Sequence, residues 1–136
     1  MARIMAIDYG TKRVGLAVTD PMKIIASALD TVHSREVLAY IKNYVEKEPV
    51  ECFVVGEPLR MNDEPSSVEQ HIKGFIRALE KQHPGIPIER EDERFTSKMA
   101  AQAMVMGGMK KKKRQEKGQL DKMSAVLILQ SYLGHV

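Results

Sequence analysis

The stretch Arg3–Asp20, RIMAIDYGTKRVGLAVTD, contains the pattern that decides the expected fold. Arg3 to Asp8 is a short apolar run rich in Ile and Met, which predicts a buried strand. Tyr9 to Lys12 forms a turn, and Val14 to Thr19 then alternates large with small side chains, the period of a second strand. Because the connection is short, these two strands are expected to form an antiparallel hairpin.

Three further strands are expected along the chain. Asp20-Pro21 marks a second turn, after which the apolar runs predict strands over residues 24–29, 52–56 and 86–90. The short second turn makes the first three strands an antiparallel meander. The last two strands each follow a helical segment, so right-handed crossovers place them parallel to the first strand.

Four helices are expected between and after these strands. The first follows Ser34 as an N-cap, and the second begins at a capping box made by Ser66 and Glu69. The other two are expected over residues 96–107 and 120–133. The whole pattern predicts an α/β fold, in which helices flank a five-stranded mixed sheet of order 3-2-1-4-5.

Composition and length fit one globular domain over residues 1–136. The chain is 43% hydrophobic and 29% charged, and no apolar run approaches the roughly 20 residues of a membrane span. The N-terminus has no signal-peptide pattern, and the only cysteine, Cys52, lies in an apolar run. We therefore expect a cytoplasmic protein without a membrane partner, in which Cys52 is a buried, reduced thiol.

Acidic side chains follow the strands that are expected to be parallel. Asp8 ends the first of them, Glu57 follows the next, and Asp92 and Glu93 follow the last. The carboxyl ends of parallel strands meet at one edge of a sheet, and Asp121 at the start of the last helix is within reach of it. Each acid alone is explained by a turn or a helix end, but their convergence predicts a site for Mg²⁺ or Mn²⁺. Two such ions promote the hydrolysis of phosphodiesters.

Phosphate contacts are expected on both sides of this acidic site. Thr11, Lys12 and Arg13 directly follow the first strand, where they are suited to bind phosphate beside Asp8. Thr96 and Ser97 are expected at a helix N-terminus, where hydroxyl and backbone N–H groups bind a second phosphate.

The positive charge of the chain is concentrated in one segment, KKKKRQEK at residues 110–117. The chain has 21 basic and 18 acidic residues, a formal charge of +3, but outside this segment it has 15 basic and 17 acidic residues. Such a run is often only solvated, yet beside an acidic site it is also suited to hold a polyanion. We favour nucleic-acid contact through its basic side chains Lys110, Lys111, Lys112, Lys113 and Arg114. The low aromatic content, 5%, favours contact with the backbone over base stacking.

Four sequence blocks, in this order and spacing, resemble the YqgF/RuvX family of RNase H-like proteins. They are DYGTKRVGLAVTD, VVGEPLRMND, EDERFTSKMA and LDKMSAVLILQSYL, and together they extend over almost the whole chain. The resemblance implies a ribonuclease H-like fold and a metal-dependent nuclease of the bacterial cytoplasm. Members of the family have been described as Holliday junction resolvases and as nucleases that mature the 5′ end of pre-16S rRNA.

The same resemblance implies an acidic triad for metal binding and catalysis. Carried over residue by residue, it falls on Asp8, on Glu93 of the DER motif and on Asp121, with Arg94 of that motif as a nucleic-acid contact. More distant resolvases of this fold have their second acid directly after the fourth strand, nearest Glu57. We therefore keep Asp92 and Glu57 as alternatives to Glu93.

Several functions are compatible with these residues. The first is a metal-dependent endonuclease that processes structured RNA, with pre-rRNA and pre-ribosomal particles as partners, and the second is a resolvase of branched DNA. An actin-like ATP-binding domain and a non-catalytic RNA-binding module are weaker alternatives. A resolvase that cuts two strands symmetrically is expected to be a two-fold dimer, but no part of the sequence distinguishes a monomer from a homodimer.

Overall fold

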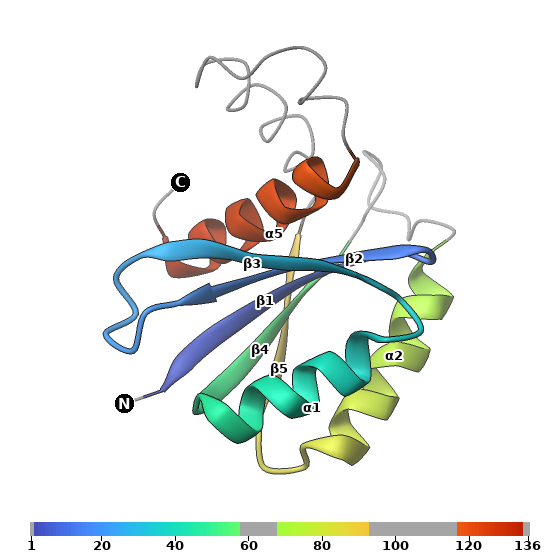
Figure 1. Cartoon of the computed structure of the whole chain (residues 1–136), viewed down its shortest axis with the longest axis horizontal. Coiled ribbons are helices and arrows are strands. Elements are labelled where there is room, and N and C mark those ends of the chain that lie inside the picture. The colour runs from blue at the N-terminus through green and yellow to red at the C-terminus, as the bar shows by residue number, and fades with distance from the viewer. Residues whose placement is uncertain (1, 58–67, 93–116, 135–136) are drawn as a thin grey trace.

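The computed structural model describes residues 2–57, 68–92 and 117–134, and for 117–122 it describes the backbone alone. The strands in chain order are β1 (Arg3–Tyr9), β2 (Arg13–Thr19), β3 (Ala26–His33), β4 (Val50–Glu57) and β5 (Ile88–Asp92). The helices are α1 (Val37–Lys47), α2 (Glu69–Gln82) and α5 (Lys117–Leu133). The strands form a five-stranded sheet of order β3-β2-β1-β4-β5, which confirms the expected topology (Figure 1).

The directions of the strands place three carboxyl ends at one edge of the sheet. β1 pairs antiparallel with β2, which pairs antiparallel with β3, whereas β1, β4 and β5 run parallel to one another. The turn between β1 and β2 and the connection from β3 to α1 lie at this same edge, on the right-hand side of Figure 1. The tight turns and the helical crossovers produce this arrangement, as expected for a meander followed by β-α-β units.

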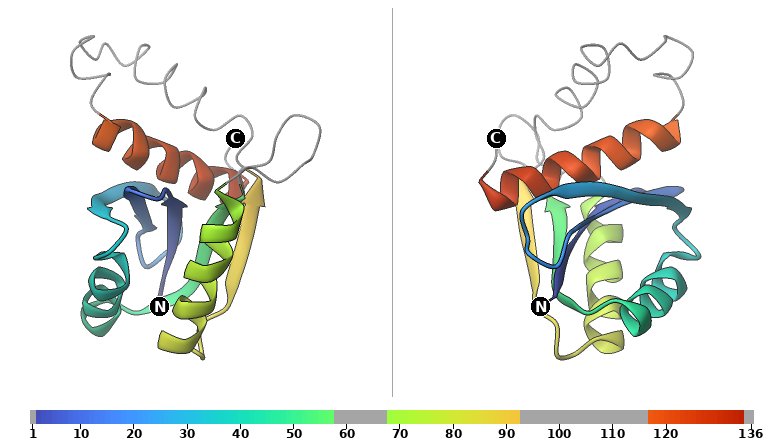
Figure 2. Two further views of the ribbon diagram at one scale, coloured as in Figure 1. Left: turned by 90° about the vertical axis from the view of Figure 1, so that its right-hand side faces the viewer. Right: turned by 60° about the vertical axis from the view of Figure 1, so that its left-hand side comes forward.

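The two faces of the sheet are covered by different helices. We call the side covered by α1 and α2 the helix-pair face, and the side covered by α5 the α5 face (Figure 2). Strand side chains alternate between the faces, so the large apolar residues of β2 point to the helix-pair face and its small residues to the α5 face. The helix-pair face buries the larger core, which includes Met5, Ile7, Val14, Leu16, Val18, Phe53, Val55, Ile72, Phe75 and Leu79. The α5 face buries Ile4, Ala6, Ala17, Cys52, Val54, Ala125, Ile128 and Leu129.

The third strand begins later than its apolar residues suggest. Ile24 and Ile25 belong to the turn before β3, where their side chains are 58% and 62% exposed. The carboxylate of Asp20 accepts the N–H groups of Ile24 and Ile25, both at 2.8 Å, and also that of Met22. Three hydrogen bonds to one side chain hold the turn through Ile25, which overrides the strand propensity of the two isoleucines.

Neither predicted helix cap forms. The N-cap of α1 is Glu36, and the hydroxyl of Ser34 instead donates to the carbonyl of Thr11 at 2.6 Å. The N-cap of α2 is Val68, and Glu69 uses its carboxylate in an ion pair with Arg90. Both side chains have partners that are distant in the sequence, which local patterns do not reveal. Ser66 lies outside the described residues.

The remaining elements agree closely with the sequence pattern. β5 begins at Ile88 and not at Ile86, because the N–H of Ile86 donates to the carbonyl of His83 and so belongs to the turn after α2. α5 ends at Leu133, followed by Gly134 with φ 82°, the left-handed conformation that favours glycine. The helix expected over residues 96–107 lies outside the described residues.

Cys52 is buried on the α5 face as a free thiol, as its apolar surroundings in the sequence indicate. Burial raises the pKa of this thiol, which disfavours the reactive thiolate. Among the described residues, no helix combines the length and the apolar character needed to cross a bilayer.

Candidate active site at the carboxyl edge of the sheet

Asp8 is the acid that the structure places most firmly at this edge. It is the penultimate residue of β1 and is half-buried. The next residue, Tyr9, stacks on Phe75 of α2 with ring centroids 4.8 Å apart, so Tyr9 lies on the helix-pair face. Because neighbouring residues of a strand point to opposite faces, Asp8 lies on the α5 face, in line with buried Ile4 and Ala6.

Glycines flank Asp8 on both neighbouring strands. Gly15 of β2 is its direct partner across the antiparallel pair. On β4, Val55 is the partner of Ile7, and Gly56 follows it on the α5 face. Neither glycine carries a side chain, and both are buried. Asp8 therefore lies between two buried glycines on the α5 face, an arrangement that we call the glycine cradle.

The turn after β1 is tightly constructed and anchored. A Cβ added to Gly10 would come within 2.6 Å of the carbonyl oxygen of Arg13, so only glycine allows this close approach of the backbone. The carbonyl of Thr11 accepts the Ser34 hydroxyl, and the carbonyl of Lys12 accepts the Ser34 N–H at 3.2 Å. Backbone groups thus fix the turn, while the side chains of Thr11 and Lys12 remain exposed to solvent.

Arg90 ties together the ends of β4, β5 and α2 on the helix-pair face. Its guanidinium donates to the carbonyls of Val55 and Gly56, at 3.2 and 3.0 Å, and to both carboxylate oxygens of Glu69, at 2.8 and 3.3 Å. Glu69 is buried, with 6% of its surface exposed. The sequence pattern missed this pair because Glu69 and Arg90 are 21 residues apart and belong to different elements.

Glu57 and Asp92 end β4 and β5 as register partners, but they lie on the other face from Asp8. Glu57 follows the alternation of Phe53 and Val55, which are buried in the core of the helix-pair face. The guanidinium of Arg90 on the same face comes within 3.9 Å of the Glu57 carboxylate. The two alternative acids are thus at the expected edge, but the sheet separates them from Asp8.

The backbone of Asp121 lies in the first turns of α5, on the same face as Asp8. The hydroxyl of Ser131 near the other end of α5 donates to Glu91 of β5 at 2.9 Å. Ten residues separate Asp121 from Ser131, which corresponds to about 15 Å of helix, or about three strand spacings. Counted from β5, three spacings bring the backbone of Asp121 to β2, the strand on which Gly15 pairs with Asp8. Figure 1 shows the N-terminal end of α5 toward the β1–β2 turn.

The chain matches known proteins over almost its whole length. A family model described as "RuvX: Holliday junction resolvase" matches residues 2–135. The chain belongs to the RuvX family. A relative from Christiangramia forsetii, named "Putative pre-16S rRNA nuclease", is 54% identical over 98% of each chain. A relative of the same name from Phocaeicola vulgatus is also 54% identical, over 98% of this chain and 96% of its own.

Solved structures confirm the fold of this RuvX-family chain. RuvC from Thermus thermophilus in complex with a Holliday junction substrate superimposes with a TM-score of 0.59, at 18% identity, over 98% of this chain and 97% of its own. A second structure of T. thermophilus RuvC gives a TM-score of 0.57. The ribonuclease H-like arrangement implied by the sequence blocks is therefore correct, including the sheet order.

Several residues expected at the site of this RuvX-family chain lie outside the described residues. They are Glu93, Arg94, Thr96, Ser97 and the basic side chains Lys110, Lys111, Lys112, Lys113 and Arg114. Of Asp121 only the backbone is described. Within the described part of the chain, no three His, Cys, Asp or Glu side chains are grouped closely enough to hold a metal ion. Asp8 is the member of the expected triad whose side chain is described.

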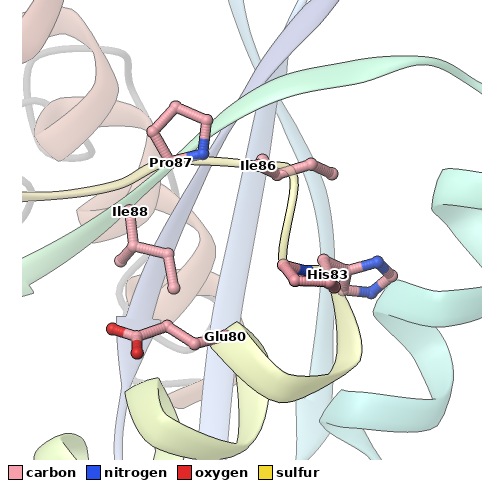
Figure 3. Close-up of a pocket in the computed structure, with 6 residues that line it drawn as sticks. Glu80, His83, Ile86, Pro87 and Ile88 are labelled. Carbon is pink, nitrogen blue, oxygen red and sulfur yellow. The ribbon is translucent and has the colours of Figure 1, made fainter.

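A separate hollow lies at the opposite edge of the sheet, between the end of α2 and β5 (Figure 3). It has a volume of about 370 Å³ and is lined by Glu80, His83, Pro84, Ile86, Pro87 and Ile88. Burial, with a smaller contribution from Lys42, lowers the pKa of His83, which favours a neutral imidazole. This hollow is not part of the acidic edge, and its single carboxylate, Glu80, does not make it a metal site.

Proposed function

We propose that this protein is a divalent-metal-dependent endonuclease that hydrolyses phosphodiester bonds during 5′-end processing of pre-16S rRNA in the bacterial cytoplasm. The observation that carries the proposal is the position of Asp8, in a glycine cradle on the same face as the helix that contains Asp121. The names of relatives that are 54% identical over almost their whole length support rRNA as the substrate.

The proposed catalytic acids are Asp8, Glu93 and Asp121. Glu57 and Asp92 lie on the helix-pair face, so the thickness of the sheet separates their carboxylates from that of Asp8. Arg90 also lies beside Glu57, where its guanidinium competes with a metal ion for the carboxylate. This arrangement favours Glu93 over both alternatives as the second acid.

The donor set fits Mg²⁺ or Mn²⁺. A carboxylate oxygen at the end of a strand, backed by the buried side chains of Ile4 and Ala6, is a rigid ligand for a hard cation. In the glycine cradle, the two residues beside this carboxylate on the neighbouring strands carry no side chain. When bound, two ions at such a site activate water and neutralise the charge on the leaving oxygen. The role of the protein's own residues is to hold the carboxylates in position.

Phosphate binding next to this site is proposed for Thr11, Lys12 and Arg13. The exposed side chains of Thr11 and Lys12 project from a turn whose backbone is fixed by Ser34, so little backbone entropy is lost when they bind.

The basic segment at residues 110–114 is proposed to hold the RNA backbone more loosely, through electrostatic attraction. Replacement of Lys110–Lys113 by glutamine should weaken binding and reduce its dependence on salt, with the fold retained.

The decisive experiment compares wild type with Asp8→Asn on a pre-16S rRNA fragment that carries its 5′ extension. We expect cleavage by wild type with Mg²⁺ or Mn²⁺, loss of cleavage in EDTA, and loss in Asp8→Asn while RNA binding is retained. A purified Asp8→Asn protein that cleaves as fast as wild type would refute the proposed site. Undiminished cleavage in EDTA would refute the role of a metal.

Resolution of branched DNA is the second candidate, because the matching family model is described as a Holliday junction resolvase. The same acids would act on both substrates, so mutations alone do not distinguish them. A four-way DNA junction should therefore be tested beside the rRNA fragment at equal ionic strength. Symmetric cleavage of the junction, together with a two-fold dimer in solution, would favour DNA, and cleavage restricted to the rRNA fragment would favour RNA.

A further inference from the structure

A second row of side chains extends the α5 face from Asp8 to the edge of the sheet. Across β2 and β3, Gly15 is the direct partner of Thr31, and Arg13 is the direct partner of His33. Direct partners share a face, and Arg13 alternates with buried Val14, which lies on the helix-pair face. Arg13 and His33 therefore lie on the same face as Asp8, one row farther toward the carboxyl edge.

Arg13 is the diagonal neighbour of Asp8 in this arrangement. Asp8 pairs with Gly15, and Arg13 lies two residues from Gly15 on the same strand. Diagonal neighbours of an antiparallel pair are about 7–8 Å apart, which long side chains span easily. His33 is one strand farther from Asp8, at the edge strand β3.

The ring of His33 is held in one orientation by a backbone N–H group two residues farther along the chain. Its Nδ1 atom accepts the N–H of Arg35 at 3.0 Å, so Nδ1 carries no proton in this arrangement. The neutral imidazole then has its proton on Nε2, which makes Nε2 a hydrogen-bond donor. The side chain of His33 is exposed to solvent, and the hydrogen bond from Arg35 orients its ring. An oriented donor at an exposed position is suited to bind an anionic oxygen.

The surroundings of His33 are rigid and carry mainly positive charge. Ser34 anchors the end of β3 to the β1–β2 turn through its hydroxyl and its N–H. Lys12 and Arg35 are exposed on either side of this junction, and Glu36 is the exposed acid next to them. Counting the half-buried Arg13 and Asp8, three basic side chains stand against two acids here, and this small excess of positive charge favours a polyanion.

We propose that His33, together with Arg13, binds the phosphate backbone of the nucleic-acid substrate beside Asp8, with the Nε2–H of His33 as a hydrogen-bond donor. The inference rests on the proposed function, because it extends the substrate-binding surface of the same site. It assigns His33 a role that its position in the sequence does not indicate.

The contributions of His33 and Arg13 to RNA binding should differ in their dependence on salt. In an Asp8→Asn background, which prevents cleavage, we would measure the affinity for the pre-16S rRNA fragment at several salt concentrations and about pH 8. His33→Phe keeps a ring but loses the donor, so the affinity should fall about tenfold with an unchanged salt slope. Arg13→Gln removes one charge and should lower the slope by about one unit, because one fewer counterion is released.

Two further variants serve as controls. One restores the hydrogen-bond donor, and the other tests for nonspecific effects of replacing a histidine. His33→Gln has an amide N–H near the position of Nε2, so it should recover most of the affinity that His33→Phe loses. His71 is an exposed histidine of α2, on the other side of the sheet, and His71→Phe should bind as tightly as its parent. Thermal unfolding of each protein verifies that the fold is retained.

Failure of this inference would be distinct from failure of the proposed function. If His33→Phe binds the fragment as tightly as the parent, His33 does not contact the substrate, even though wild type still cleaves and Asp8→Asn does not. Equal loss of affinity in His33→Phe and His71→Phe would also overturn the proposal, because it would indicate a nonspecific effect. If wild type neither binds nor cleaves the rRNA fragment, the proposed function itself is wrong.

Discussion

Asp8 of β1 lies directly opposite Gly15 of β2, on the face of the sheet that α5 covers. Gly56 of β4 lies on the other side of Asp8 on the same face. On both neighbouring strands, the residue beside the Asp8 carboxylate therefore lacks a side chain. β2 accordingly combines the large residues Val14, Leu16 and Val18 on the helix-pair face with Gly15 and Ala17 on the α5 face.

A side chain in place of Gly15 should impair the site. In Gly15→Val, the branched side chain would occupy the α5 face next to the carboxylate, so we expect cleavage to fall by on the order of tenfold to a hundredfold. Binding of Mn²⁺, measured by calorimetry, should weaken in parallel. Gly74→Ala is the matched control, since a Cβ at Gly74 of α2 has nothing within 4 Å. Normal Mn²⁺ binding by a folded Gly15→Val protein would contradict the cradle.

The turn after β1 should tolerate no side chain at Gly10. In Gly10→Ala the new Cβ would meet the carbonyl oxygen of Arg13 at 2.6 Å, and the hairpin must shift to relieve the clash. We expect a loss of roughly 1–3 kcal/mol in the free energy of unfolding, measured with urea. Gly85→Ala has open space around its Cβ and should change the stability by less than about 1 kcal/mol. Similar stabilities for the two variants would argue against the close approach.

The ion pair between Glu69 and Arg90 should contribute strongly to stability. Glu69 is 6% exposed and accepts two hydrogen bonds, so Glu69→Gln leaves the half-buried guanidinium of Arg90 without its full charge partner. We expect a destabilisation of roughly 2–4 kcal/mol in urea unfolding. The exposed pair of Lys23 and Glu51 is the matched control, and Glu51→Gln should cost at most about 1 kcal/mol. Equal costs for the two variants would contradict the difference in burial.

The acids of the helix-pair face should not be essential for catalysis. We expect Glu57→Gln and Asp92→Asn to cleave within a few-fold of wild type, whereas Asp8→Asn should lose at least about a hundredfold in rate. The physical reason is that the sheet lies between these two carboxylates and Asp8. Single-turnover rates on the same RNA fragment provide the comparison. A hundredfold loss in Asp92→Asn with an intact fold would identify Asp92, and not Glu93, as the second acid.

The turn before β3 should make a pH-dependent contribution to stability. The N–H of Ile25, supported by those of Ile24 and Met22, holds the pKa of Asp20 below its usual value. Because the pKa is lower in the folded protein, the contribution is complete above the unfolded pKa and is lost as the pH falls through the folded one. Asp20→Ala should therefore lower the urea midpoint at pH 7, and the difference should shrink below about pH 4. An equal difference at pH 7 and pH 3 would refute this explanation.

Much of the fold could be predicted from local patterns. The alternation in β2 identified both the strand and its two faces, and the short turns and helical crossovers determined the sheet order. The late starts of β3 and β5 result from local turns, whereas the two errors in helix capping occurred where a side chain binds a distant partner. Ser34 was expected to cap α1 but donates to Thr11, and Glu69 was expected in a capping box but pairs with Arg90. Propensities describe neighbours in the sequence, and these partners are 23 and 21 residues away.

The sequence by itself determined that acids gather at the carboxyl edge of the sheet, because the ends of parallel strands must meet there. Only the tertiary structure decided which of them share a face. A side chain's face depends on strand register and on the helix that covers it, and both result from packing between distant segments. For that reason Asp8, Arg13 and His33 lie together on the α5 face, whereas Glu57 and Asp92, at the same edge, lie on the other side of the sheet.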